Sequence, residues 1–206
     1  MKRGWIAALV LVLTALPALA ADWSLPAYKA PPEITFRKDS ILVFGGLYRS
    51  GNMGQALSPF GNYDSAGVIG AAYRREFYDI GLGIKFGAEA GLAGRFGDGN
   101  SAEIWGGATF RRAFVVANVV TISPGIVMGL SATSSAMGVE RLREIQHGGD
   151  STLLFYFSPE LAFSFASIPN VDFVFRLHHR SGLKGTLGHM HEGHNASTFG
   201  VRWYFN

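Results

Sequence analysis

The sequence predicts an all-β fold, an eight-stranded antiparallel β-barrel that spans a membrane. Three observations lead to this prediction. Segments of about ten residues alternate apolar and polar side chains, as strands do when their two faces meet different surroundings. Short connections alternate with longer polar ones, and the 206 residues include 27 glycines, 13% aromatic residues and only 16% charged residues. This combination is typical of barrels of the bacterial outer membrane.

The N-terminus has the features of a secretory signal peptide. Met1-Lys2-Arg3 is followed by an apolar run that ends at Ala18-Leu19-Ala20. A basic start, an apolar core and an A-x-A-like end are the marks of such a segment. A retained membrane anchor is the alternative, but the run is short for a span. We expect a signal peptide at 1–20, a short periplasmic segment at 21–39 and the barrel at 40–206.

Charge and cysteine content narrow the classes of function. When Lys2 and Arg3 leave with the signal peptide, the formal charge falls from +3 to +1. The charge balance therefore gives no indication of nucleic acid as a partner. The chain contains no cysteine, so that disulfides and thiol chemistry are excluded. An exported domain of this kind must be held by packing or by a closed sheet.

Eight strand candidates follow the N-terminal segment. We place them at about 40–50, 63–75, 78–95, 101–112, 121–133, 151–166, 171–181 and 195–205. Alternation is clean in the third candidate, where Ile80, Leu82, Ile84 and Phe86 share a face. It is equally clean in the last, with Phe199, Val201, Trp203 and Phe205 on one face. The fourth candidate is weaker, and 113–121 is a candidate continuation of it.

Connections between these candidates alternate in length. Short links are expected at Glu76–Asp79 and Ser167–Asn170, and longer ones at 51–62, 134–150 and 182–194, with 96–100 a shorter member of the second set. In outer-membrane barrels, short turns face the periplasm and long loops face outside. The seventh strand therefore ends at the outer surface, and the eighth strand begins beside it.

The seventh candidate, 171–181, carries the residues on which the functional prediction depends. Counting by twos, one face holds Val171, Phe173, Phe175, Leu177, His179 and Ser181, and the other holds Asp172, Val174, Arg176, His178 and Arg180. In a membrane barrel the apolar face contacts lipid and the polar face lines the interior. A soluble calyx is the alternative, but Arg176, Arg180 and Arg202 are too many charges for a small dry interior. We therefore expect His179 and Ser181 to face lipid near the outer membrane edge.

His179 and Ser181 have the spacing of a base and a nucleophile. Residues i and i+2 on one strand face lie about 6.5–7 Å apart, which lets a histidine nitrogen reach a serine hydroxyl. Such a serine becomes nucleophilic when the base takes its proton and a third polar group orients the base. Candidates for the third group are Asn195 and Ser197 on the last strand, and Glu192 in the preceding loop. The alternative is an ordinary polar strand end at the membrane interface.

The segment His179-Arg180-Ser181-Gly182-Leu183-Lys184, followed by one last strand, resembles the outer-membrane lipid A 3-O-deacylase family of the PagL type. The resemblance implies that His179 is the general base and Ser181 the nucleophile in hydrolysis of an ester-linked acyl chain of lipid A, with no metal or other cofactor. The family has an asparagine directly after the serine, where this chain has Gly182. It also has a glutamate near the start of the last strand, where this chain has Asn195.

Four further residues are candidates for binding the substrate. The backbone N–H of Gly182 is a candidate donor to an oxyanion. Arg141, Arg143 and Lys184 lie in predicted outer loops, where they are able to donate charge-assisted hydrogen bonds to lipid phosphates. The alternative for these three cations is that they are solvated loop charges.

Five of the six histidines lie between 178 and 194. The spacings of His189, His191 and His194 are compatible with a transition metal. No cysteine or confidently placed carboxylate completes the set, and we favour a solvated polar loop over a metal site.

The sequence therefore predicts an outer-membrane esterase whose partners are lipid A, as part of lipopolysaccharide, and the bilayer. It leaves open whether the chain forms a homodimer. The alternative function is a non-enzymatic small barrel with a structural or adhesive role. An open pore is not expected, because side chains fill the interior of an eight-stranded barrel.

Overall fold

The computed structural model describes residues 38–57 and 60–205. The predicted signal peptide, and all but the last two residues of the predicted periplasmic segment, lie outside the described residues. Within the described part, none of the helices has the length and apolar character needed to cross a membrane.

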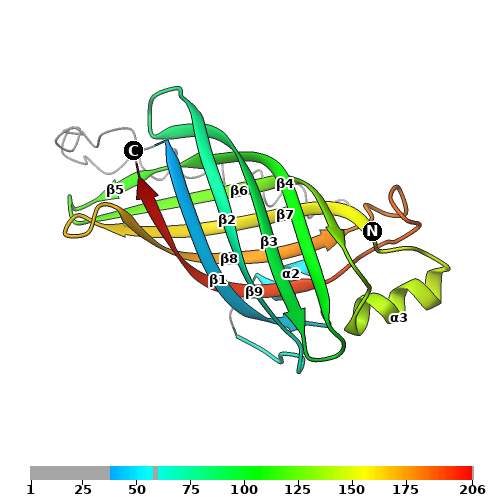
Figure 1. Ribbon diagram of the computed structural model, residues 1–206. Coiled ribbons are helices and arrows are strands. Elements are labelled where there is room, and N and C mark those ends of the chain that lie inside the picture. Colours follow the sequence, from blue (N-terminus) through cyan, green and yellow to red (C-terminus); the bar gives the residue numbers. More distant parts are fainter. Residues whose placement is uncertain (1–37, 58–59, 206) are drawn as a thin grey trace, which may run out of the picture. The chain divides into compact units, whose positions relative to one another are not determined.

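Eight long strands form a closed antiparallel barrel (Figure 1). They are β1 (Asp39–Arg49), β2 (Gly67–Asp79), β3 (Ile84–Phe96), β4 (Ser101–Arg112), β6 (Val120–Thr133), β7 (Leu153–Phe165), β8 (Val171–Ser181) and β9 (Asn195–Phe205). Pairing of β9 with β1 closes the sheet, and β4 pairs directly with β6. The short strand β5 (Phe114–Val116) pairs with β6 and extends its hairpin. The predicted fold class is confirmed.

The two ends of the barrel differ. The turn end has the connections 80–83, 117–119 and 166–170, and the loop end has 50–66, 97–100, 134–152 and 182–194. The loop end also carries two helices, α2 (Met53–Ala56) and α3 (Gly138–His147). Figure 1 places α3 at the end of the barrel where β8 ends. Short turns at one end and long loops at the other correspond to the periplasmic and outer sides of an outer-membrane barrel.

The predicted boundary between the second and third strands was wrong. Glu76–Asp79, expected to be the link, belongs to β2, and the turn lies four residues later. The Asp79 side chain accepts a hydrogen bond from the Gly81 backbone N–H at 2.9 Å, which stabilises the turn there. Gly81 and Gly83 have positive φ angles of 82° and 73°. Ile80 and Leu82 continue the apolar alternation into the turn, and this misplaced the boundary.

The interior is filled by charged side chains that pair with one another. Arg74 lies 2.8 Å from Glu89 and 2.7 Å from Glu160, and Arg176 lies 2.7 Å and 2.5 Å from the same two carboxylates. Arg202 adds a contact to Glu160 at 2.9 Å. All five side chains are buried. The paired carboxylates compensate the arginines that made a soluble calyx implausible from the sequence.

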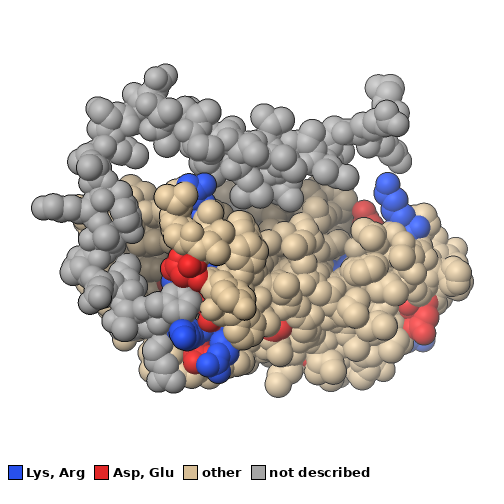
Figure 2. All heavy atoms as spheres, turned by 90° about the horizontal axis from the view of Figure 1, so that it is seen from above, with Lys and Arg blue, Asp and Glu red and all other residues tan. Residues whose placement is uncertain are grey.

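The outward face of the strands is apolar. Its exposed large side chains include Val43, Ile69, Leu92, Ile104, Met128, Phe173, Phe199, Val201 and Trp203. In the space-filling view of Figure 2, charged residues gather towards the two ends and the described surface between them is largely uncharged. A polar interior and an apolar wall are the arrangement of a membrane barrel, the reverse of a soluble one.

Candidate active site

The candidate site lies on the outward face of β8 and β9, at the loop end. His179 and Asn195 are direct partners in the antiparallel register. The Nδ1 atom of His179 forms a hydrogen bond with Oδ1 of Asn195. Because an amide oxygen only accepts hydrogen bonds, this contact places the imidazole proton on Nδ1 and leaves Nε2 as the basic nitrogen.

A segment of the first long loop fixes the other end of the Asn195 side chain. We call Gly51–Leu57, which contains α2, the α2 flap. Asn195 Nδ2 donates to the Gly51 carbonyl at 2.8 Å, and Ser197 Oγ donates to the Ala56 carbonyl at 2.8 Å. The α2 flap thus lies on the outside of β9. The contact with Gly51 determines which way the Asn195 amide faces, and with it the tautomer of His179.

The α2 flap is held in shape by a capping box. Asn52 Oδ1 accepts a hydrogen bond from the Gln55 N–H at 3.0 Å, and Gln55 Oε1 accepts one from the Asn52 N–H at 3.1 Å. Two otherwise unpaired backbone donors of a very short helix are satisfied in this way. The site is well covered, since His179 is only 6% exposed and Asn195 only 1%.

Ser181 is the last residue of β8 and shares the outward face with His179. It is half-buried and pairs with Phe155 of β7. Among the hydrogen bonds of the described residues, none joins Ser181 to His179. Catalytic hydrogen bonds are often long without substrate and tighten when it binds, so the absence of this hydrogen bond does not by itself remove the pair as a candidate.

The wall beside His179 has a local break. Cross-strand pairing of β7 with β8 is interrupted between Tyr156 and Glu160, where Pro159 has no N–H to donate. Ser158 Oγ instead donates to the Leu177 carbonyl at 2.8 Å. The Phe157 ring meets the His179 ring edge-to-face, with centroids 6.4 Å apart. His179 is therefore bounded by an aromatic side chain towards β7 and by an amide towards β9.

Another candidate for the third group, Glu192, pairs with an arginine instead. Its side chain is 45% exposed, and its Oε2 atom is 3.4 Å from Nη2 of Arg143. Arg143 also donates to the carbonyls of Gly193 and Ser50. This arginine joins α3, the last loop and the start of the first loop, and its donors are engaged within the protein. The structure brings Asn195, not Glu192, into contact with His179.

The remaining predicted residues lie around this group. Arg141 and Lys184 are exposed at the loop end. Gly182 is buried directly after Ser181. A Cβ on Gly182 would lie 1.9 Å from the Met190 carbonyl oxygen, so only glycine fits.

The three loop histidines do not converge. The ring of His191 lies 5.0 Å from that of His147 on α3, whereas His194 is buried against Tyr48, with ring centroids 3.8 Å apart. Across residues 38–57 and 60–205, no group of three or more His, Asp or Glu side chains is placed to hold a metal ion.

Comparisons with known proteins concern the fold. No protein-family model matches the chain, and no curated protein matches it. Among solved structures, the outer-membrane enzyme PagL superposes with a TM-score of 0.55 at 15% identity, over 80% of this chain and 98% of that one. Neisserial surface protein A superposes with a TM-score of 0.51 at 13% identity, over 81% of this chain and 97% of that one. The fold is that of outer-membrane barrels.

The sequence prediction missed two features of this outer-membrane barrel, the helices α2 and α3 at its loop end. For α2 a signal was present, because Asn52-x-x-Gln55 is the spacing of a capping box. For α3, Val139, Leu142 and Ile145 recur at helical spacing. The contact of Asn195 with the Gly51 carbonyl had no sequence signal, since it depends on the path of a long loop.

Proposed function

We propose that this outer-membrane barrel is an esterase that removes an ester-linked acyl chain from lipid A in the outer leaflet. The observation that carries the proposal is the His179–Asn195 hydrogen bond on the lipid-facing side, with Ser181 two residues along the same face. Polar groups on such a face are costly unless they lie at the interface or have a function. The likeness to PagL supports the fold alone, and the chemistry rests on these three residues.

The first half of the reaction forms an acyl-enzyme. Ser181 Oγ attacks the ester carbonyl carbon while Nε2 of His179 takes the hydroxyl proton. Asn195 Oδ1 accepts a hydrogen bond from the Nδ1–H of His179 and holds the ring in the tautomer in which Nε2 is basic. The tetrahedral intermediate collapses when the bond to the sugar oxygen breaks, and His179 returns its proton to that oxygen. The Gly182 N–H is the proposed donor to the oxyanion.

The second half releases the fatty acid. Water attacks the acyl carbon, His179 takes the water proton, and the bond to Ser181 Oγ breaks as that oxygen recovers a proton. The acyl chain lies along the apolar outer wall, at the depth where Ser181 meets the interface. Arg141 and Lys184, both exposed at the loop end, are the proposed partners of the lipid A phosphates.

The test follows acyl-chain loss in cells. The wild-type chain, His179→Ala and Ser181→Ala are expressed in a bacterium with intact lipid A, and the extracted lipid A is analysed by mass spectrometry. We expect the wild type to remove one acyl chain and each variant to be at least ~10³-fold slower, as when a member of a catalytic triad is lost. His191→Ala, an exposed histidine of the neighbouring loop, is the control and should match wild type.

Two outcomes would overturn the proposal in different ways. Acyl loss that persists in both variants would show that these residues are not the machinery. Intact lipid A in cells that contain folded wild-type protein would favour the alternative function, a structural or adhesive barrel.

A further inference from the structure

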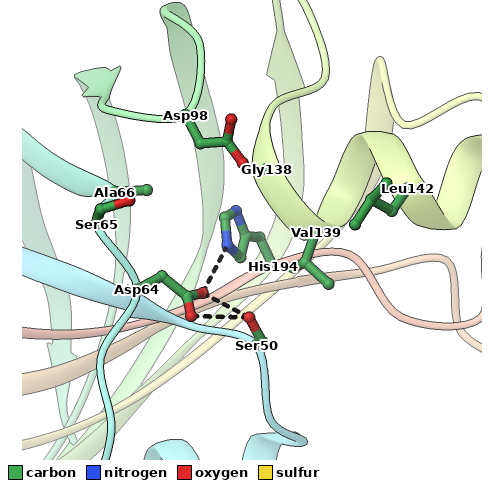
Figure 3. Close-up of a pocket in the computed structure, with 9 residues that line it drawn as sticks. All are labelled: Ser50, Asp64, Ser65, Ala66, Asp98, Gly138, Val139, Leu142 and His194. Atoms are coloured by element: carbon green, nitrogen blue, oxygen red, sulfur yellow. Dashed lines mark hydrogen bonds and ion pairs between the residues drawn. The ribbon is translucent and has the colours of Figure 1, made fainter.

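A second polar site lies at the loop end, separate from the candidate active site. A pocket of about 240 Å³ is lined by residues from the loops 50–66 and 97–100, from the first half of α3 and from the residue before β9 (Figure 3). Its polar lining residues are Ser50, Asp64, Ser65, Asp98 and His194. None of them has a part in the reaction proposed above.

His194 is the feature that requires an explanation. Its side chain is 1% exposed, yet neither ring nitrogen has a hydrogen-bond partner among the described residues. Burying a polar atom without a partner is costly, and such atoms in native proteins usually contact a ligand or a bound water. The ring stacks on Tyr48 and, in Figure 3, lies at the centre of the pocket. The partner of His194 therefore belongs in the pocket.

The carboxylate of Asp64 is placed to share that partner. Its Oδ2 atom is 3.9 Å from Nε2 of His194, too far for a direct hydrogen bond. A hydroxyl oxygen at a usual distance of about 2.8 Å from both atoms would bridge them. The carboxylate is itself fixed, because Ser50 Oγ donates to both of its oxygens at 2.8 Å. Asp64 and His194 together present one acceptor and one group able to donate or accept.

Space is also kept free on the α3 side. Gly138 has a positive φ of 53°, and a Cβ there would lie 3.3 Å from Cε1 of His194 and 3.7 Å from Oδ2 of Asp98. A side chain at this position would enter the pocket between the imidazole and the second carboxylate. Val139 and Leu142 supply apolar surface next to this gap. Convergent polar groups beside an apolar wall are typical of small-ligand sites.

The charges decide which kind of ligand suits the pocket. The lining contains two aspartates and no lysine or arginine, which disfavours an anion such as phosphate. The ring of His194 adds no charge of its own. Burial, followed by the positive charges of Arg95, Arg143 and Arg180, holds the pKa of His194 well below its usual value, so that a neutral imidazole shares the pocket with the two carboxylates and is able to form a hydrogen bond with a hydroxyl group.

We propose that this pocket is a binding subsite for a neutral, hydroxyl-bearing group the size of one sugar ring. Ring hydroxyls bridge Asp64 and His194 and reach Asp98, and the apolar face of the ring lies against Val139 and Leu142. The pocket volume of about 240 Å³ corresponds to the share of about eight water molecules in the liquid, at ~30 Å³ each, which is room for one ring. The inference goes beyond the proposed esterase and holds whether or not Ser181 is a nucleophile.

The test measures sugar binding to the whole protein, purified in a detergent that has no sugar headgroup. Methyl glycosides of glucose, mannose and N-acetylglucosamine are titrated separately, and saturation transfer from protein to sugar is recorded by NMR. We expect saturable binding of at least one glycoside. Methylammonium or inorganic phosphate at the same concentration should not displace it.

Variants place the binding in the pocket. Asp64→Asn, at a partly exposed position that does not endanger folding, and His194→Phe, which keeps the stacking on Tyr48, should each weaken binding about tenfold or more. The control His191→Phe should bind as wild type does. Displacement of the glycoside by lipopolysaccharide would identify a membrane sugar as the natural ligand, and lack of displacement a free sugar.

Three results would overturn the proposal. In the first, no glycoside gives saturable transfer, as expected of a pocket that holds water alone. In the second, methylammonium or phosphate competes with the sugar. In the third, Asp64→Asn and His194→Phe both bind the glycoside as tightly as wild type.

Discussion

In the proposed reaction, Asn195 orients His179 with a neutral amide, where a carboxylate would also stabilise the imidazolium that is expected to form as Ser181 loses its proton. The amide fixes the tautomer through Oδ1 and is itself fixed by the Gly51 carbonyl. On this account Asn195 is a positioning residue. Its removal should affect the rate of the chemical step more than the binding of lipid.

Asn195 substitutions test this role. Asn195→Ala should lower kcat by about 10²- to 10⁴-fold with little change in KM, because the imidazole loses its fixed tautomer. Asn195→Asp should retain activity, since a carboxylate also accepts a hydrogen bond from the Nδ1–H group. Both constants are measured with lipid A in mixed micelles. Asn100→Ala, an exposed position in another loop, is the control, and an unchanged kcat in Asn195→Ala would remove Asn195 from the mechanism.

For single residues, the sequence predicted which face of the barrel a strand side chain occupies, but it did not predict where the side chains of the loops lie. Counting by twos placed Arg176, His178 and Arg180 inside, and all three are buried in the interior. The choice between Glu192 and Asn195 remained open, because the position of Glu192 depends on Arg143, which reaches it from α3, about fifty residues earlier in the chain.

Among the elements, the α2 flap has the greatest bearing on the site. It lies against the loop end of β9, and its hydrogen bonds to Asn195 and Ser197 link the first long loop to the candidate catalytic group. A helix of four residues has little stability of its own. The capping box therefore has a large share in holding this flap against the barrel.

Asn52→Ala should loosen the α2 flap. Loss of an N-cap side chain costs about 1 kcal/mol, which corresponds to roughly fivefold faster amide exchange in the flap. Hydrogen exchange of the Gln55 and Ala56 amides, followed by mass spectrometry, measures the effect. Thr186→Ala removes a local side-chain hydrogen bond in the last loop and should leave this exchange unchanged. Equal exchange in Asn52→Ala and wild type would contradict the role given to the capping box.

The ends of a strand were predictable where the apolar–polar alternation stopped at the end of the strand. The prediction of the ends failed where the alternation ran on into the turn. The β2–β3 turn contains Ile80 and Leu82, whose apolar side chains mimic strand positions, whereas the turn itself depends on glycines with positive φ and on the Asp79 side chain. The prediction missed α2 and α3 because both lie in long polar segments, which it assigned to irregular loops.

In the molecule as a whole, the closed sheet encloses a network of charges. Glu160 accepts hydrogen bonds from Arg74, Arg176 and Arg202, which reach it from three other strands. At the loop end Glu140 of α3 is also buried, 2.6 Å from Arg95 and 2.5 Å from Arg180. The interior could be predicted to be polar from strand parity, but which carboxylate meets which arginine depends on the closure of the barrel.

Removing one buried and one exposed carboxylate compares how much interior and surface ion pairs contribute to the free energy of unfolding. Glu160→Ala leaves three buried arginines short of a partner and should lower the free energy of unfolding by about 3–5 kcal/mol. Glu192→Ala breaks an ion pair whose carboxylate is 45% exposed and should cost at most about 1 kcal/mol. Urea unfolding in lipid vesicles, followed by tryptophan fluorescence, measures both. Equal losses in the two variants would contradict the stabilising role of the interior network.

Everything proposed about chemistry depends on a serine at the membrane interface that reacts as a nucleophile. The most direct measurement treats the micelle-solubilised protein with a long-chain alkyl fluorophosphonate and determines the intact mass and the modified peptide. The account predicts one phosphonyl group on Ser181, none in Ser181→Ala, and labelling at least ~10²-fold slower in His179→Ala. A folded wild-type protein that stays unlabelled, or one labelled equally fast without His179, would contradict it.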